Sequence, residues 1–162
     1  ENLSFGLSKG ECFALLGING AGKSTTFKTL TAEEEPTLEQ SQSKDGHDHL
    51  VPESPQADWL LPQYNPIFES LSVEQNIEYF ARIKGIPAYC RSNLIDSVID
   101  KLGLEIHRKK ASGTLSGGNK RKLSVAIAIV GNPPIILLDE PSAGMDPEAR
   151  RFMWSVVANI AS

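Results

Sequence analysis

Short apolar runs alternate with segments of helical hydrophobic spacing along the 162-residue chain. The run ECFALL at residues 11–16 ends at a glycine and predicts a strand. The run IILLDE at residues 135–140 is continuously apolar before its two acids, which is typical of a strand buried on both faces. Such strands, separated by helices, predict an α/β fold with a mainly parallel sheet.

Five segments predict helices. Residues 23–30, 119–130 and 147–160 are three of them. Ser72 and Gln75 have capping-box spacing and open a helix that continues through Lys84 and is ended by Gly85. The remaining helix is stopped by Gly103, and its apolar stripe, which we assign to the core, consists of Leu94, Ile95, Val98, Ile99 and Leu102.

Composition and charge narrow the classes of function. The hydrophobic content of 40% and charged content of 22% are ordinary for a globular chain. The net charge of −4 is spread along the sequence, so we expect no nucleic acid as the main partner. The basic runs at residues 108–110 and 120–122 are expected to be solvated faces. Cys12 and Cys90 are too few for a disulfide framework, and Cys12 is expected to be a small buried hydrophobe.

The sequence contains no signal peptide and no apolar run long enough to cross a bilayer. Any link to a membrane is therefore expected through another part of the protein or another subunit. The chain begins beside an amphipathic strand and stops within a predicted helix. We interpret it as a fragment, truncated at both ends.

A glycine-rich loop carries the first candidate chemistry. Residues 17–24 (GINGAGKS) fit G-x-x-x-x-G-K-[ST] between a predicted strand and a predicted helix. The glycines let the backbone wrap closely around phosphates, with N–H groups pointing inward at the helix N-terminus. Lys23 is predicted to reach the β- and γ-phosphates, and the Ser24 hydroxyl to ligate Mg²⁺. The predicted ATP-binding residues are Gly17, Asn19, Gly20, Ala21, Gly22, Lys23, Ser24 and Thr25.

Two acids end the apolar strand at residues 135–138. Asp139 can hold Mg²⁺ directly or through water, and Glu140 is placed to orient or deprotonate an attacking water. An apolar run ending in two acids is a weak signal alone, because many strands end in exposed carboxylates. Joined to the phosphate-binding loop, it predicts ATP hydrolysis.

A second loop holds Leu115, Ser116, Gly117, Gly118 and Asn119. Alone, it reads as a turn that caps the helix after it. However, the phosphate-binding loop, LSGGNKRK and IILLDEPSAGMD follow one another along the chain in this order. With these motifs, the chain resembles the nucleotide-binding domain of ATP-binding-cassette (ABC) transporters, except at residues 38–62. The resemblance implies a P-loop NTPase core with an α-helical subdomain that carries this signature. It also implies that two domains pack head to tail, with each signature closing over the γ-phosphate held by the other.

Further positions follow from the resemblance. Gln63, in LLPQY, resembles the Q-loop glutamine that senses Mg²⁺ and faces the membrane domains. The implied metal ligands are then Ser24, Gln63 and Asp139, and the implied catalytic residues are Lys23, Gln63 and Glu140. Asp146 resembles the D-loop aspartate that crosses the dimer interface. The stretches TTFKTLT, ARIKG and GMDPEARR are most like the A subfamily, whose members mostly move lipids or sterols.

Within one ABC-type domain we assign four parts. Residues 1–37 form the P-loop core, 38–62 an aberrant segment, and 63–130 the Q-loop and helical subdomain with the signature. Residues 131–162 hold the Walker B strand, the D-loop and the helix after it. The family's switch histidine and adenine-stacking aromatic have no counterpart in this chain, and we expect His47, His49 and His107 to be surface residues. The fragment is therefore expected to hydrolyse ATP poorly.

The aberrant segment departs from the family pattern. Residues 38–61 are polar and show no strand alternation, where family members have a small antiparallel sheet. They are either a divergent loop or a product of a shifted reading frame, since a shift would restore a run similar to the family's approach to Gln63. In the second case we expect no well-formed strand in this segment.

The resemblance implies an ATP-hydrolysing domain on the cytoplasmic face of a membrane transporter. Its partners would be a second nucleotide-binding domain and the transmembrane domains. The alternatives are a soluble ABC-type ATPase of translation or DNA maintenance, and an inactive gene fragment. The repair and chromosome types insert a long coiled coil between phosphate-binding loop and signature, and residues 23–116 leave no room for one.

Overall fold

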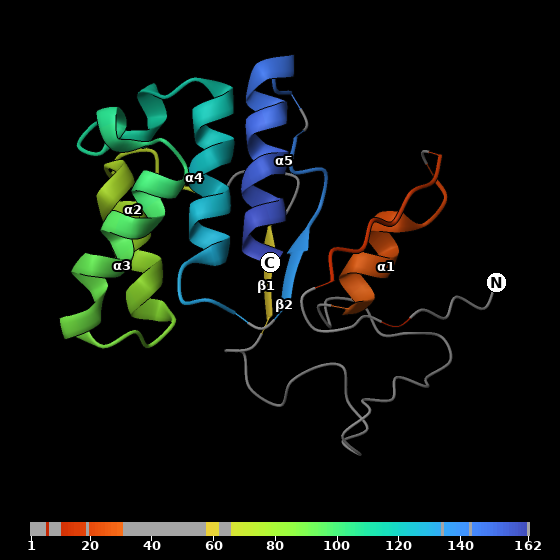
Figure 1. The fold of residues 1–162 in the computed structure, drawn as a ribbon, viewed down its shortest axis with the longest axis horizontal. Helices are drawn as coiled ribbons and strands as arrows, with labels where there is room; N and C mark the ends of the chain where they lie inside the picture. The colour runs from red at the N-terminus through yellow and green to blue at the C-terminus, as the bar shows by residue number, and fades with distance from the viewer. Residues whose placement is uncertain are drawn as a thin grey trace.

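The computed structural model describes residue 6 and residues 11–18, 20–30, 58–61, 66–133, 135–142 and 144–161. Figure 1 shows the order of its elements. They are α1 (Lys23–Leu30), β1 (Asp58–Leu61), α2 (Val73–Ile83), α3 (Ala88–Lys101), the 3₁₀ turns η1 (Glu105–His107) and η2 (Ser112–Thr114), α4 (Gly117–Ile129), β2 (Ile135–Leu138) and α5 (Pro147–Ala161).

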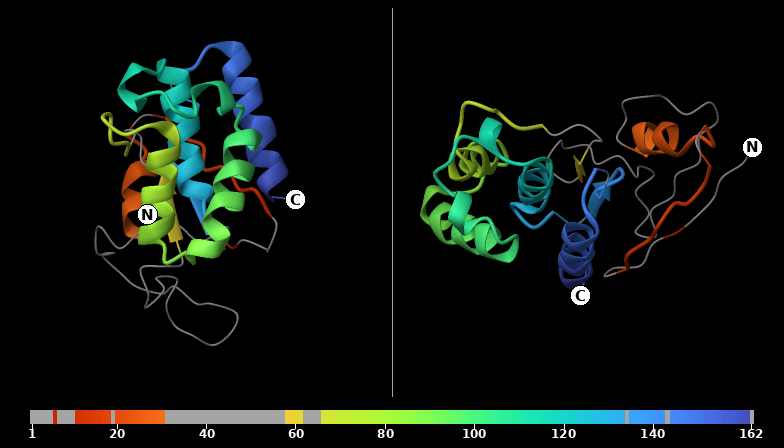
Figure 2. Two further views of the ribbon diagram at one scale, coloured as in Figure 1. Left: turned by 90° about the vertical axis from the view of Figure 1, so that its left-hand side faces the viewer. Right: turned by 90° about the horizontal axis from the view of Figure 1, so that it is seen from above.

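The elements follow one another along the long axis of the molecule. Helices α2 and α3 lie at one end, α4 comes next, then β1, β2 and α5, and α1 lies on the far side of the strands (Figures 1 and 2). β1 and β2 pair in parallel, as the sequence predicts, with Asp58 opposite Ile135 and Leu61 opposite Leu138. Because of this register, both strands end at the same edge of the sheet.

Local signals in the sequence explain where the helices begin and end. The Ser72 hydroxyl accepts a hydrogen bond from the backbone N–H of Gln75 at 3.2 Å, and the Gln75 side chain accepts one from the N–H of Ser72 at 2.9 Å. The predicted capping box of α2 is thereby confirmed. Gly85 follows the helix with φ of +71°, a conformation that glycine adopts without steric cost. The predicted helix at residues 119–130 begins two residues earlier, at Gly117.

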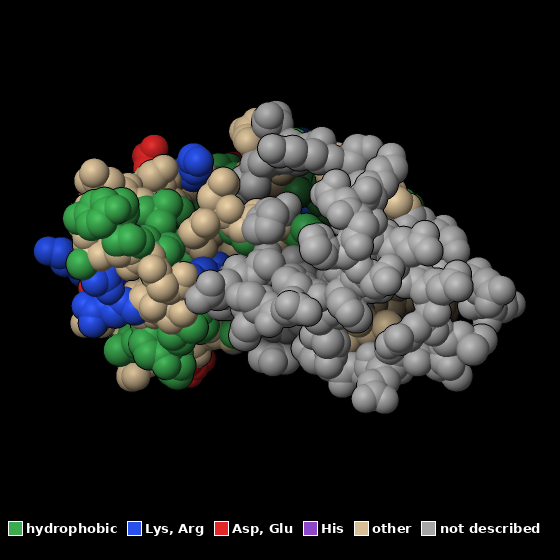
Figure 3. Space-filling view, turned by 90° about the horizontal axis from the view of Figure 1, so that it is seen from below, with side chains coloured by type: hydrophobic (Ala, Val, Ile, Leu, Met, Phe, Trp, Pro, Cys, Tyr) green, Lys and Arg blue, Asp and Glu red, His purple; other side chains and the backbone are tan. Residues whose placement is uncertain are grey.

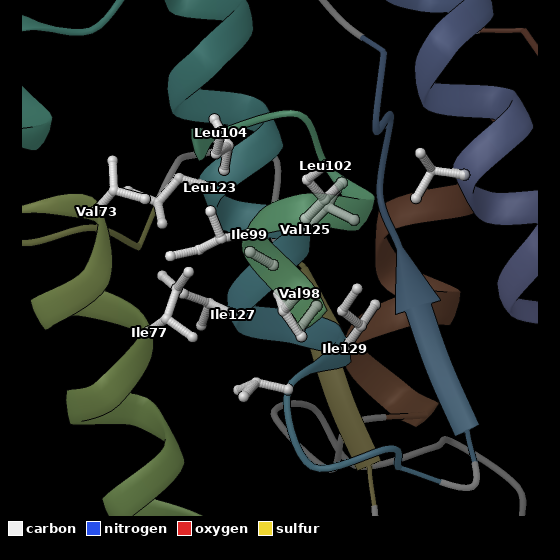
Figure 4. Packing of buried hydrophobic residues seen from close by; sticks show 14 of the residues in the cluster. Val73, Ile77, Val98, Ile99, Leu102, Leu104, Leu123, Val125, Ile127 and Ile129 are labelled. Atoms are coloured by element: carbon white, nitrogen blue, oxygen red, sulfur yellow. The ribbon is translucent and has the colours of Figure 1, made fainter. Parts of the chain in front are cut away.

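Helix α4 lies at the centre of the hydrophobic core. Its residues from Leu123 to Ile129 are all buried, and they pack against apolar side chains of α2 and α3 (Figure 4). Each fully buried aliphatic side chain contributes about 1.5–3 kcal/mol relative to an exposed one. The apolar stripe before Gly103 is confirmed as core, since Ile95, Val98, Ile99 and Leu102 are buried.

Asn76 is a fully buried polar residue of α2 that fixes the chain around it. Its Oδ1 accepts a hydrogen bond from the N–H of Phe68 at 2.8 Å. Its Nδ2 donates to the carbonyl oxygens of Phe68 and Ser72 and to the Ser112 hydroxyl, at 2.9–3.0 Å. One side chain therefore connects the segment before α2 with the turn that precedes α4.

Lys84 connects α2 to the other end of α4. Its ammonium donates to the carbonyl oxygens of Ile127, Ala128 and Val130 at 2.7, 2.9 and 2.7 Å. The last carbonyls of a helix have no partner within the helix, and a nearby cation both satisfies them and interacts favourably with the helix dipole. Burial lowers the pKa of Lys84 to about 7.

Two expectations about strands are wrong, and a third, which depended on a shifted reading frame, is contradicted at residues 58–61. Residues 11–16 form no strand and Cys12 is exposed, because an apolar run becomes a strand only where another strand supplies its hydrogen bonds. β2 is half-exposed, with Ile135 38% exposed, since burial on both faces needs covering layers on each side. A shifted reading frame was expected to leave residues 38–61 without a well-formed strand, yet their last four residues, DWLL, form β1 beside β2. Residues 38–57 lie outside the described part of the chain.

The surface of the helical end is partly apolar. Figure 3 shows hydrophobic side chains beside Lys and Arg on the described part of one face. Phe68, Tyr79, Ile83 and Tyr89 are exposed by 43–84%. The rings of Phe68 and Tyr79 meet edge to face, with centroids 4.9 Å apart. None of the described helices combines the length and apolar character needed to span a membrane.

We predict that Asn76→Ala lowers the free energy of unfolding by about 2–3 kcal/mol, since it leaves buried donors and acceptors without partners. Gln75→Ala, at the neighbouring position, removes only an exposed cap and should cost about 0.5 kcal/mol. Denaturant titration followed by circular dichroism measures both values. Equal losses for the two variants would contradict the assigned role of Asn76.

Candidate functional site

The glycine-rich loop at residues 17–25 has the backbone conformation that a phosphate cradle requires. Gly20 and Gly22 have φ of +83° and +90°, in the left-handed region that favours glycine. A Cβ on Gly17 would lie 3.2 Å from the Cβ of Ala21, so a side chain there would crowd the loop. Asn19 lies outside the described residues.

Lys23 is the first residue of α1 and folds back over the loop. Its ammonium donates to the carbonyl oxygens of Gly17 at 2.8 Å and Ile18 at 3.1 Å. Ser24 and Thr25, in the same first turn, are exposed. An ammonium, two hydroxyls and the N–H groups of a helix N-terminus are the donors that fit a nucleoside triphosphate with its Mg²⁺. The described part of this loop therefore fits the group that the sequence predicts.

The two acids follow β2 in a turn at residues 139–142, which we call the acidic turn. Asp139 is half-exposed and Glu140 is exposed. Glu140 has φ of +46°, a left-handed conformation that is unusual for a residue with a side chain. β1 ends two residues before Gln63, at the sheet edge where β2 leads into this turn. Gln63 itself lies outside the described residues.

Arg121 of α4 connects the acidic turn to the signature helix. Its Nη2 donates to the carbonyl oxygens of Asp139 at 2.6 Å and Glu140 at 3.1 Å, and its Nε donates to that of Pro141 at 3.1 Å. The residue is 3% exposed, so the expectation that residues 120–122 form a solvated face is wrong for Arg121. Burial lowers the pKa of Arg121, and the charges of Asp139 and Glu140 oppose this effect. The guanidinium remains protonated at neutral pH.

The signature loop forms the beginning of α4. Ser116 is the N-cap, and its hydroxyl accepts a hydrogen bond from the N–H of Asn119 at 3.3 Å. Ser116 and Gly117 are exposed, whereas Leu115 is buried beneath them. The loop therefore presents the positive end of a 13-residue helix at the surface.

His107 supports the signature from the side. Its Nε2 lies 3.0 Å from the Asn119 side-chain amide, and its Nδ1 lies 3.2 Å from the Lys110 ammonium. Since lysine can only donate, Nδ1 is the acceptor in its contact with Lys110. Burial, followed by the charges of Lys110 and Lys122, lowers the pKa of His107. His107 is half-buried rather than a surface residue as expected.

Arg108 also departs from the predicted solvated face at residues 108–110. It forms ion pairs with Glu74 of α2, Asp96 of α3 and Glu105 of η1, at 2.7–3.0 Å. Hydrogen bonds to Glu105, then Asp96, raise its pKa above the usual arginine value. These pairs connect the helices that surround the signature helix.

Asp146 begins α5. Its Oδ1 accepts hydrogen bonds from the N–H groups of Ala149 at 2.9 Å and Glu148 at 3.0 Å. These N–H groups, that of Ala149 foremost, stabilise the charged carboxylate and lower the pKa of Asp146. Nearby, the Lys122 ammonium lies 4.2 Å from the ring centroid of Phe152. Asp146 is exposed beside the signature helix.

The structure brings some predicted site residues together and separates others. The acidic turn and the signature helix are joined by Arg121, whereas α1 and its loop lie on the opposite side of β2 from α4 (Figures 1 and 2). Sequence reasoning missed Arg121 and His107. A signal for Arg121 was present, because Val125 and Ala128, four and seven residues later on the same helical face, are apolar and buried.

Comparison with known proteins identifies the family. The profile of the ABC transporter family matches residues 1–143. The chain belongs to this family. It therefore has the P-loop NTPase fold, and the resemblance described from its motifs is confirmed.

Individual relatives are similar over nearly the whole chain. The chain is 44% identical to the human retinal-specific phospholipid-transporting ATPase ABCA4 over 162 residues, which is 99% of the chain and 7% of the relative. It is 41% identical to the human ATP-binding cassette sub-family A member 2, again over 99% of the chain and 7% of the relative. It is 42% identical to the human phospholipid-transporting ATPase ABCA7, over 96% of the chain and 7% of the relative. The likeness to the A subfamily is thereby confirmed, although the chain spans only about 7% of the length of these relatives.

We predict a pH-dependent contribution of Asp146 to stability. The pKa of Asp146 is lower in the folded protein than in the unfolded chain. The stabilisation from the charged carboxylate is therefore fully present above the usual aspartate pKa. It is lost as the pH falls from that value through the lower pKa of the folded protein. Asp146→Asn keeps an N-capping oxygen that does not titrate. Its melting temperature should therefore fall less than that of the unmodified protein between about pH 6 and about pH 3.

Asp100→Asn, at an exposed position of α3, controls for the loss of one carboxylate. It should follow the unmodified protein across the same range. If Asp146→Asn also follows the unmodified protein, the hydrogen bonds of Asp146 do not stabilise the native state.

Proposed function

We propose that this chain binds and hydrolyses ATP and powers transmembrane transport through ATP-driven, head-to-tail closure of two such domains. The observation that carries the proposal is the separation of its two phosphate-holding elements. The exposed signature begins α4, while the loop with Lys23 lies across β2 from it (Figure 1). A signature on that side suits a phosphate held by a second domain better than one held by its own loop.

Different residues would bind the phosphates, bind the metal and activate the attacking water. N–H groups of the loop with Gly17, Gly20 and Gly22 would hold the phosphates, together with the Lys23 ammonium. Ser24 and Asp139 would hold Mg²⁺ together with Gln63, which comes two residues after the end of β1 in the sequence. The metal would neutralise charge on the phosphates. Glu140 would orient the attacking water and accept its proton.

The second domain would supply the other half of each site. Ser116, Gly117, Gly118 and the helix dipole of α4 suit an anion, and in the proposed dimer they contact the γ-phosphate of the partner domain. Asp146, exposed beside the signature helix, would cross the same interface. The two half-sites are incomplete apart and complete together.

A membrane partner and a lipid substrate complete the proposal. The exposed Phe68, Tyr79 and Ile83 of the segment after Gln63 give an apolar surface that suits a protein partner, here the transmembrane domains. The domain would then work at the cytoplasmic face of the membrane. Two relatives are named as phospholipid-transporting ATPases, which supports a phospholipid as the transported substrate.

We predict that Glu140→Gln in the full-length protein keeps ATP binding and lowers the rate of hydrolysis about 10²–10⁴-fold, because the amide keeps the shape but not the basicity of the carboxylate. Glu78→Gln, at a half-exposed position of α2 where the carboxylate pairs with Arg82, is the matched control and should hydrolyse ATP normally. Phosphate release measures turnover, and crosslinking of the two ATP-binding domains measures closure with ATP and Mg²⁺. A Glu140→Gln protein that fails to close with ATP would contradict the proposed cycle.

We predict that Ser116→Arg leaves ATP binding nearly intact and prevents closure, because a bulky charge fills the space for the partner's phosphate. Lys23→Ala should instead lose most ATP affinity. Domains carrying one variant each, when mixed, form one doubly defective site and one intact site, so mixing should restore part of the hydrolysis that each lacks alone.

Ser155→Arg places the same charge on the exposed face of α5 and should behave as the unmodified protein. If Ser116→Arg loses ATP affinity before closure, or if mixing restores nothing, the signature serves its own loop and head-to-tail pairing is wrong.

A further inference from the structure

We propose that Arg121 is a positioning residue for ATP hydrolysis, which holds the backbone of the acidic turn so that the Glu140 carboxylate meets the attacking water. This inference rests on the proposed function of Glu140. Arg121 itself touches neither nucleotide nor water in this assignment. It acts through the main chain of residues 139–141.

Three hydrogen bonds to three successive carbonyls carry the argument. Arg121 reaches the carbonyl oxygens of Asp139, Glu140 and Pro141 at 2.6, 3.1 and 3.1 Å. The guanidinium is planar and presents donors in a fixed fork, so acceptors at Nε and Nη2 constrain direction as well as distance. A lysine ammonium has no such fork. Arginine therefore determines the path of the acidic turn in a way that another cation does not.

The conformation of Glu140 explains why the turn needs such a constraint. Its φ of +46° costs roughly 1–2 kcal/mol for a residue with a Cβ. A strained residue persists only where its surroundings determine the backbone on both sides. The carbonyls on either side of Glu140 belong to Asp139 and Pro141, and both accept from Arg121. In the proposal, loss of these bonds lets Glu140 leave this strained conformation, so its carboxylate is no longer held toward the attacking water.

The position of Arg121 is fixed in turn by α4. The residue is 3% exposed and lies on the same helical face as the buried Val125 and Ala128. Five residues earlier, Ser116 caps the N-terminus of the helix. The same short helix thus carries the signature and the side chain that orients the acidic turn.

The first experiment compares Arg121→Lys with the unmodified full-length protein. We expect kcat for ATP hydrolysis to fall about tenfold to 100-fold, since a displacement of about 1 Å can cost that much. The KM for ATP should change less than twofold, because Lys23 and its loop are untouched. Arg121→Gln, which is uncharged but keeps N–H donors, should give the same pattern. Unchanged kcat in folded Arg121→Lys and Arg121→Gln proteins would overturn the proposal.

Lys84→Met is the matched control. Lys84 is also a partly buried cation with three backbone carbonyl acceptors, but these lie at the opposite end of α4. Its loss should lower the melting temperature and leave kcat per folded molecule unchanged. If both variants lower kcat equally per folded molecule, Arg121 is merely structural.

A double variant separates action through Glu140 from general damage. In single-turnover measurements, adding Arg121→Lys to Glu140→Gln should lower the remaining rate less than twofold, because the group that Arg121 positions is already lost. A further loss as large as in the unmodified background would contradict the proposal. If Glu140→Gln keeps full turnover, the proposed function of Glu140 fails instead.

Hydrogen exchange tests the turn without hydrolysis. In nucleotide-free protein, Arg121→Lys should speed amide exchange at residues 139–146 and leave α2 unchanged, while Lys84→Met should not affect these amides. Unchanged exchange at residues 139–146 in Arg121→Lys shows that Arg121 does not hold the acidic turn, whatever the ATPase activity.

Discussion

A backbone carbonyl that loses water on burial must accept a hydrogen bond from the protein, and side-chain cations meet this requirement for carbonyls on both sides of β2 in the sequence. Helix α4 is buried along most of its length. Lys84 supplies donors to the carbonyls at its C-terminal end, and Arg121, from its first turns, supplies donors to the carbonyls of the acidic turn. Lys84 thus donates to carbonyls that lie just before β2 in the sequence, and Arg121 donates to carbonyls that lie just after it.

A polar network around Asn76 provides hydrogen-bond partners for backbone groups at the end of the molecule formed by α2 and α3. Asn76 holds the segment after Gln63 and the turn before the signature in one set of hydrogen bonds. Arg108 connects α2, α3 and η1 through carboxylates, and His107 of η1 contacts Asn119. Because partly exposed ion pairs contribute little each, the apolar core around α4 supplies most of the stability, and the polar contacts fix its geometry.

The sequence predicted the features that depend on local signals. The capping box of α2, the glycines after α2 and α3, and the positions of α1 and α5 follow from caps and hydrophobic spacing, which act within a few residues. The strand at residues 11–16 and the burial of β2 were predicted wrongly, because both depend on partners distant in the chain. β1 was missed since the polar majority of residues 38–57 concealed four residues that pair with β2.

The same distinction applies to the candidate site. Lys23, Ser116 and Asp139 were found from motif spacing, but the role of Arg121 depends on carbonyls 18–20 residues away, which no local pattern records. A basic run alone predicts that Arg121 is solvated. The prediction changes only when Arg121 is seen to share a helical face with the apolar Val125 and Ala128. Since α4 begins at the signature and Arg121 contacts the acidic turn, any displacement of α4 on contact with a partner's phosphate would move the donors that hold Glu140. In the proposed dimer, the helix that contacts one nucleotide therefore also orients the carboxylate that acts on the other.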